Sequence, residues 1–190
     1  MIADLPELEY LASGRRSKVF TFVENKKKFV VKIEKENTKA KERIKNEIKF
    51  LKILNEKGIG PELIKEGEDY FVAEFIQGEL ILPFLEKSKN PYPVLIKILE
   101  QCKIMDELKI NKLEMHHPMK HLLIKNKKVV MIDFERCYVT DKPKNVTQFC
   151  QFLLRAKRLK LERDKFIPLI RNYKNKMDKE SFNELIKNVK

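Results

Sequence analysis

The amino-acid sequence predicts an α+β protein in which a small β-rich lobe built around one helix precedes a mainly helical lobe. Segments rich in β-branched and aromatic residues crowd into the first 75 residues, which is typical of strands. One stretch with helical periodicity interrupts them, and such stretches dominate after Gly78. We therefore expect an N-terminal lobe over residues 1–76 and a C-terminal lobe over residues 77–190.

The strands of the N-terminal lobe are short apolar runs separated by turn-forming residues. The first two runs flank an Asn-Lys-Lys turn at residues 25–27 and predict a β-hairpin. The predicted strands cover residues 18–24, 28–34, 62–66 and 70–75.

Five stretches predict helices, and in the first three the apolar residues fall on one helical face. The first of them carries Ile44, Ile48 and Leu51 on that face and ends before Gly58 and Gly60. The predicted helices cover residues 38–56, 93–108, 145–160, 166–173 and 181–189.

A second hairpin is predicted late in the chain, where two apolar runs at residues 122–124 and 129–132 flank Lys125–Lys128. Asp133 stands at its exit, in the sequence VVMIDFE. A carboxylate at the end of a buried strand is well suited to hold Mg²⁺ against a nucleotide phosphate.

The composition is that of a globular protein, with 43% hydrophobic and 36% charged residues. No apolar run approaches the roughly 20 residues that span a bilayer, and the acidic N-terminus MIADLPELEY lacks a secretory pattern. The three cysteines share no close spacing, which favours free thiols in a reducing cytosol. We expect a cytoplasmic protein with no membrane partner.

The net charge of +13 is concentrated in two regions. Residues 14–52 hold 14 lysines and arginines against 5 acids, and residues 155–190 hold 12 against 5. In one interpretation these regions bind an acidic partner, for example nucleotide phosphates, RNA or an acidic protein. The alternative is a lysine-rich solvated surface of the kind found in heat-adapted proteins.

A phosphoryl-transfer site needs a loop over the phosphates, a lysine on them, an acid that holds this lysine, and metal carboxylates. In LASGRRSKVF, Gly14 stands at the tip of a turn, and Arg15, Arg16 and Ser17 offer charge and hydrogen bonds. Lys32 lies within the apolar strand FVVKIEK, so its ammonium is either solvated or faces a specific anion.

Glu47 favours the second alternative for Lys32. It lies on the helix face that also carries Phe50, Leu51 and Leu54, where an unpaired carboxylate is costly. A strand lysine followed at this separation by a helix glutamate predicts an ion pair.

With these motifs the chain resembles the protein-kinase-like superfamily, and in particular its archaeal atypical Ser/Thr protein kinases. LASGRRSKVF resembles a degenerate glycine-rich loop, VVKI the phosphate-binding lysine motif, and IDFE the metal-binding triplet. The resemblance covers roughly residues 9–137 and implies the two-lobed kinase-like fold, with Mg²⁺ on Asp133. It also implies a nucleotide site in which ATP contacts Gly14, Ser17 and Lys32. Glu47, the partner of Lys32, and the backbone from Glu74 to Ile76 complete this site.

The catalytic loop departs from the family pattern. The run LLI at residues 122–124 can be aligned with the strand that follows the usual asparagine of the family. His121 then takes the asparagine position, and His116 takes that of the catalytic aspartate. A second register, with two extra loop residues, gives the aspartate position to Glu114, which keeps the carboxylate charge. The resemblance therefore implies that Glu114 or His116 orients the acceptor hydroxyl.

All three histidines of the chain, His116, His117 and His121, fall within this loop, which favours a site role. In one interpretation His121 is a second metal ligand beside Asp133. In the other the three imidazoles form a transition-metal site, although Pro118 disfavours a regular helix through them.

The resemblance implies an atypical ATP- and Mg²⁺-dependent Ser/Thr protein kinase that phosphorylates a protein hydroxyl, its own included. The short segment of about 57 residues after Asp133 has no Ala-Pro-Glu motif, which favours one dedicated substrate. Two alternatives stay open. One is a nucleotide-binding pseudokinase that acts as a switch or scaffold, with RNA or ribosomes as partners suggested by the basic regions, and the other is a small-molecule kinase.

Overall fold

The computed structural model describes residues 5–35 and 42–189, which form two compact units. The first unit comprises the described residues up to Gln77 together with Val130–Cys137, and the second comprises Gly78–Val129 and the residues from Tyr138 onward. The sequence division assigned residues 130–137 to the C-terminal lobe. In the structure they group with the N-terminal residues, because the backbone of this segment is hydrogen-bonded to the helix of the first unit.

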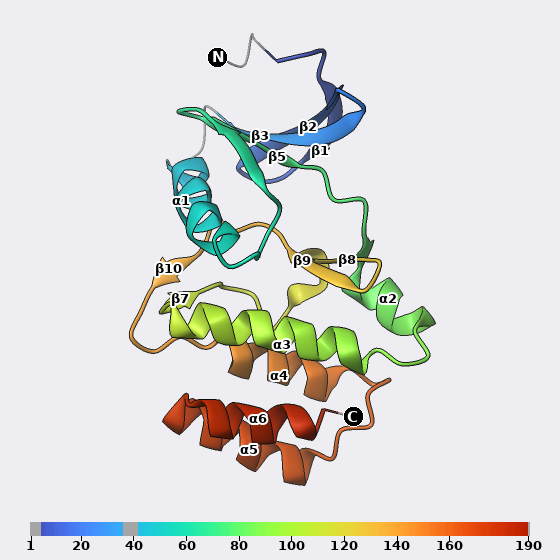
Figure 1. The fold of residues 1–190 in the computed structure, drawn as a ribbon, viewed down its shortest axis with the longest axis vertical. Coiled ribbons are helices and arrows are strands. Elements are labelled where there is room, and N and C mark those ends of the chain that lie inside the picture. The colour runs from blue at the N-terminus through green and yellow to red at the C-terminus, as the bar shows by residue number, and fades with distance from the viewer. Residues whose placement is uncertain (1–4, 36–41, 190) are drawn as a thin grey trace. The chain divides into compact units, whose positions relative to one another are not determined.

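The first unit contains a five-stranded antiparallel sheet in the order β1-β2-β3-β5-β4 (Figure 1). Between β2 and β3, Asn25 and Lys26 are both left-handed, with φ of 49° and 63°, as a two-residue hairpin turn requires. The strands are β1 (Glu9–Ser13), β2 (Ser17–Glu24), β3 (Lys27–Glu34), β4 (Leu63–Glu66) and β5 (Tyr70–Glu74).

The single helix of this unit, α1 (Arg43–Asn55), packs beside the sheet (Figure 1). It buries the face predicted from the sequence, and Leu54 is fully buried. The helix was expected to begin at residue 38, and residues 36–41 lie outside the described residues. After the helix, the Asn55 side chain bonds to the carbonyls of Ile59 and Pro61, which turns the chain into β4.

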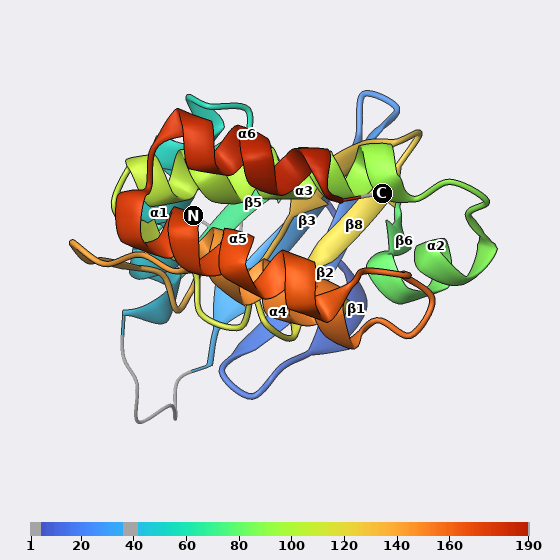
Figure 2. The same ribbon diagram turned by 90° about the horizontal axis from the view of Figure 1, so that it is seen from below.

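The second unit is mainly helical, as predicted, and α5 and α6 run alongside each other in it (Figure 2). The sequence missed α2, which has only seven residues, and placed the end of α4 five residues too late, because Ala156 is extended. The helices are α2 (Ile81–Lys87), α3 (Tyr92–Glu107), α4 (Asn145–Arg155), α5 (Arg163–Lys176) and α6 (Lys179–Lys187).

Short strands complete the fold. The predicted late hairpin is confirmed, with Asn126 and Lys127 left-handed at its turn. The remaining strands are β6 (Glu79–Leu80), β7 (Ile110–Asn111), β8 (Leu122–Lys125), β9 (Lys128–Met131) and β10 (Tyr138–Val139).

Within the described residues no helix is long and apolar enough to cross a bilayer. The three cysteines are buried free thiols.

A buried carboxylate, Asp106, organises the second unit. It accepts hydrogen bonds from the Asn145 N–H at 2.9 Å, the Val146 N–H at 3.3 Å and the Tyr173 hydroxyl at 3.2 Å. It thereby satisfies donors at the start of α4 that have no partner within the helix. The Asn145 side chain in turn accepts from the Lys112 N–H at 2.8 Å, so the same network fixes the chain that leads to Glu114.

Candidate functional site

The first unit holds a buried lysine with two acidic partners. Lys32 lies on β3, in register with Val19 of β2 and Phe71 of β5, and its side chain is only 13% exposed. Its Nζ donates to Glu47 Oε2 at 2.6 Å and to Asp133 Oδ1 at 3.0 Å. The ion pair expected between strand and helix is therefore present, and Asp133 joins it.

Glu47 connects three segments of the first unit. It is almost fully buried on α1, and while one carboxylate oxygen accepts from Lys32, the other accepts from the Phe134 N–H at 3.1 Å. Both oxygens are thus hydrogen-bonded, as a buried carboxylate requires. Glu47 consequently fixes the Lys32 side chain and the backbone that follows Asp133 with a single group.

The protonation states of this cluster follow from burial and pairing. Burial disfavours the charged form of Lys32, but the attraction of Glu47 and Asp133 outweighs it, so the pKa of Lys32 is raised and its charge persists at neutral pH. Burial also raises the pKa of Glu47, which the charge of Lys32 and the Phe134 N–H counteract. Lys32 therefore keeps its charge, and Glu47 is the partner whose charged form burial disfavours.

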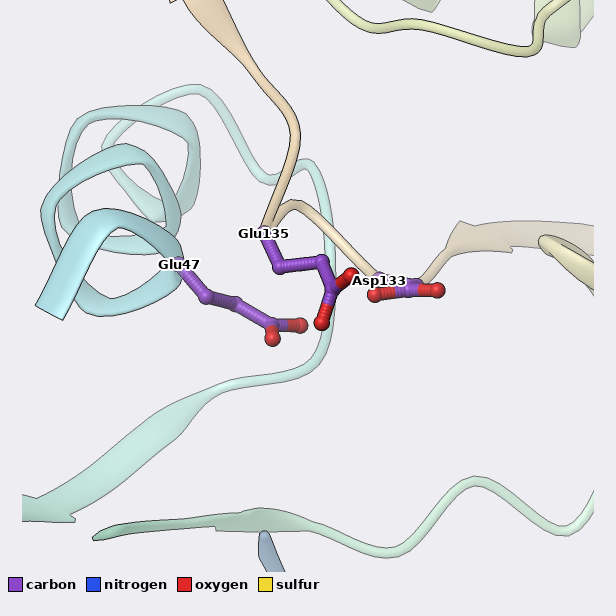
Figure 3. A group of neighbouring side chains, drawn as sticks. All are labelled: Glu47, Asp133 and Glu135. Carbon is purple, nitrogen blue, oxygen red and sulfur yellow. The ribbon is translucent and has the colours of Figure 1, made fainter. Parts of the chain in front are cut away.

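Glu135 is a third carboxylate in the site that sequence reasoning did not single out. Figure 3 shows Glu47, Asp133 and Glu135 with their carboxylates directed toward a common point, and one oxygen from each lies within 4.8 Å of the others. Asp133 itself is left-handed, with φ of 65°. The available signal was the acid two positions after Asp133 in IDFE, but nothing local in the sequence says which way its side chain points.

This donor set fits a divalent cation. Carboxylate oxygens are the ligands that Mg²⁺ prefers, and Glu47, Asp133 and Glu135 are close enough to share one. Glu47 is the most buried of the three and both of its oxygens accept hydrogen bonds, so the more exposed Asp133 and Glu135 are the residues that would hold the ion. Among the described residues, the histidines form no comparable group of three ligands.

The loop and hinge residues of the resemblance also lie in the first unit. The Gly14 N–H donates to the Ser17 carbonyl at 2.9 Å, and Lys35 Nζ donates to the Gly14 carbonyl at 2.7 Å, so this turn is firmly folded. At the end of β5, the Glu74 N–H is already bonded to the Glu62 carbonyl at 2.9 Å. The Glu74 N–H is therefore not open to an adenine base.

The altered catalytic loop lies in the second unit. Glu114 is left-handed, with φ of 78°, and its Oε2 lies 3.2 Å from His121 Nε2. The rings of His116 and His117 lie 4.5 Å apart, and the Arg155 side chain donates to the His116 carbonyl. The structure thus places Glu114, one of the two candidates for the aspartate role, in close contact with His121, the candidate for the asparagine role.

Comparison with known proteins supports the fold alone. No family model matches the sequence, and neither does any curated protein. Among solved structures, the chain is similar to the autoinhibited serine kinase domain of the giant muscle protein titin, with a TM-score of 0.58 and 18% identity. The match covers 71% of this chain and 46% of that one, so this chain spans less than half the length of the titin structure. With its antiparallel N-terminal sheet and helical C-terminal part, the chain has a protein-kinase-like fold.

Proposed function

We propose that this protein is an atypical ATP-dependent Ser/Thr kinase that transfers the γ-phosphoryl group to a protein hydroxyl, its own included. The observation that carries the proposal is the position of Lys32, whose ammonium bonds to both Glu47 and Asp133. A lysine held by a helix acid beside a metal-binding acid is what phosphoryl transfer requires. The resemblance to archaeal atypical kinases with an altered catalytic loop is part of this proposal.

The residues of the first unit have separate roles in the proposed reaction. Lys32 binds the α- and β-phosphates while Glu47 fixes its position. The turn at Gly14 and Ser17 covers the phosphates, and the backbone from Glu74 to Ile76 binds adenine. Mg²⁺, when bound, would neutralise charge on the phosphates. Asp133 would hold it, with Glu135 as the second ligand that the structure suggests.

In the second unit, Glu114 is the proposed group that orients the acceptor hydroxyl. It keeps the negative charge of the aspartate that it replaces, and its contact with His121 at 3.2 Å restricts its position. His116 is the alternative candidate for this role. His121 as a second metal ligand also stays a proposal.

The test is label transfer from γ-labelled ATP to a mixture of protein acceptors and to the protein itself. We expect Lys32→Met and Asp133→Asn to abolish transfer, whereas Lys18→Ala, at an exposed lysine on the neighbouring strand, leaves it unchanged. Among the loop variants, Glu114→Gln should lose more activity than His116→Gln. Equal transfer by the wild type and by Asp133→Asn would reject the proposal.

A nucleotide-binding pseudokinase is the second candidate, and one observation favours it. Glu114 and His121 pair with each other, and imidazole is a poorer Mg²⁺ ligand than the usual amide oxygen. Under this alternative the wild type binds nucleotide with the same dependence on Lys32 but transfers no label. The substitutions Glu114→Asp and His121→Asn, made together, would then be expected to create transfer activity.

A further inference from the structure

The first unit contains an ion pair that the proposed function does not use. Arg16 Nη1 lies 2.9 Å from Glu135 Oε1, and the two residues are 119 positions apart in the sequence. Their side chains are 27% and 15% exposed, so the pair is partly withdrawn from water. The neighbouring Arg15 is exposed. Of the two arginines after Gly14, only Arg16 therefore faces the acidic cluster.

Glu135 lies between two cations. While its Oε1 accepts from Arg16, its Oε2 lies 3.8 Å from Lys32 Nζ. An anion that lies near two cations offsets their mutual repulsion. The Glu135 carboxylate supplies that anion for Arg16 and Lys32.

The backbones on both sides of this pair are fixed independently of it. The Glu135 carbonyl accepts from Arg43 Nη1 at 3.3 Å and from Asn46 Nδ2 at 3.0 Å. The Arg16 carbonyl accepts from the Lys35 N–H at 2.9 Å. None of these hydrogen bonds uses the side chain of Arg16 or of Glu135, so a change of the anion on Arg16 would break none of them.

We propose that Arg16 is a second phosphate-binding cation of the site, and that the Glu135 carboxylate takes the place of a phosphate on it until nucleotide binds. The inference rests on the nucleotide site of the proposed function. A guanidinium binds phosphate through two parallel hydrogen bonds, and a phosphate chain carries more negative charge than one carboxylate. The ligand class is a nucleoside di- or triphosphate, and its phosphate displaces Glu135 from Arg16.

This exchange makes Glu135 a determinant of affinity. Binding of a phosphate to Arg16 must break the pair of Arg16 with Glu135. The Glu135 carboxylate therefore lowers the affinity of Arg16 for any other anion. Removal of the Glu135 charge should therefore tighten phosphate binding. Removal of the Arg16 charge should weaken it and should also cancel most of the effect of Glu135.

Calorimetric titration of the full chain with ADP, in EDTA and at low salt, tests these expectations. Arg16→Gln should weaken ADP binding about tenfold, the usual scale for a lost charge-assisted hydrogen bond, and Arg16→Lys should recover part of the loss. The matched control Arg15→Gln should change the affinity less than twofold. Glu135→Gln should tighten binding, but not when combined with Arg16→Gln. Adenosine, which has no phosphate, should bind all variants alike.

Three outcomes would overturn the inference: equal losses in Arg16→Gln and Arg15→Gln, no tightening in Glu135→Gln, or full additivity of the Arg16 and Glu135 substitutions. A Glu135 that acts only as a metal ligand would give no change in EDTA and weaker binding with Mg²⁺. Thermal unfolding of each variant shows whether it is folded. Nucleotide binding without label transfer would reject the proposed kinase activity and leave the role of Arg16 standing.

Discussion

Lys32 Nζ lies 3.0 Å from Asp133 Oδ1, although 101 residues separate the two in the sequence. The contact exists because Glu47 binds Lys32 with one oxygen and the Phe134 N–H with the other. The lysine and the segment that carries Asp133 are thus held by the same buried carboxylate. We therefore expect the loss of any one of these groups to lower stability and, under the proposed function, to lower label transfer.

Replacement of Lys32 by methionine should destabilise the protein and, under the proposed function, should also abolish label transfer. The substitution leaves Glu47, which is almost fully buried, without its cation, and breaking a buried pair in this way typically costs about 3 kcal/mol or more. Urea unfolding monitored by circular dichroism measures the loss.

The double variant Lys32→Met with Glu47→Leu separates the two effects. It removes both charges from the apolar site, so most of the lost stability should return while transfer stays absent. A double variant as unstable as Lys32→Met alone would contradict the ion-pair account.

Under the proposed function, label transfer should have an acid limb that depends on Glu47. Burial raises the pKa of this carboxyl above its ordinary value of 4.5. Glu47 therefore takes up a proton at a higher pH in the folded protein than in the unfolded chain. As pH falls through the raised pKa, Lys32 loses its charged partner and label transfer should fall.

The contribution of Glu47 to stability has the opposite sign. The pKa of Glu47 is higher in the folded protein than in the unfolded chain. Between these two pKa values the native state binds more protons than the unfolded state, so the contribution of Glu47 to the unfolding free energy increases as pH falls. Both trends should be missing from Glu47→Gln, and transfer and unfolding measured at several pH values in the two proteins test this. An acid limb that is identical in the two would assign it to another group.

Gly60 should tolerate alanine far less well than Gly58 does. Both glycines are left-handed, with φ of 87° and 68°. A Cβ at Gly58 meets open space, whereas one at Gly60 would lie 2.8 Å from Leu51 Cδ1 and 3.0 Å from Phe134 Cε2. We expect a loss of about 1 kcal/mol for Gly58→Ala, from backbone strain alone, and about 3 kcal/mol for Gly60→Ala, where packing strain adds.

The two glycine variants should also differ in activity. Phe134 directly follows Asp133, so a displaced Phe134 ring in Gly60→Ala should lower label transfer in the fraction that is folded, and Gly58→Ala should retain it. Urea unfolding and transfer assays on the same preparations make the comparison. Similar stability losses in both variants would show that the Gly60 contacts relax.

The second unit should depend on Asp106. Asp106→Ala leaves the buried donors of Asn145, Val146 and Tyr173 without their acceptor, which should cost about 3 kcal/mol or more. Asp141→Ala is the control, because that carboxylate is exposed and pairs with the exposed Lys109. Chemical unfolding compares them, and we expect no measurable change in the control.

Local patterns were sufficient to predict the elements that carry the site. β-branched and aromatic residues, with the turn between the two runs, indicated β2 and β3, and the apolar face of α1 was predicted residue by residue. The same patterns failed where tertiary contacts act. The short α2 lacks a periodic signal of its own, and α4 ends at Arg155 although the sequence favours more helix.

The sequence alone determined that Lys32 and Glu47 need each other, because a carboxylate on an apolar helix face must find a cation wherever the chain places it. Only the tertiary structure decided that Glu135 lies between Lys32 and Arg16 and that residues 130–137 group with the first unit. The need for a partner is a property of one residue and its neighbours in the chain. The identity of a partner 119 positions away depends on how helix and sheet pack, which no local pattern records.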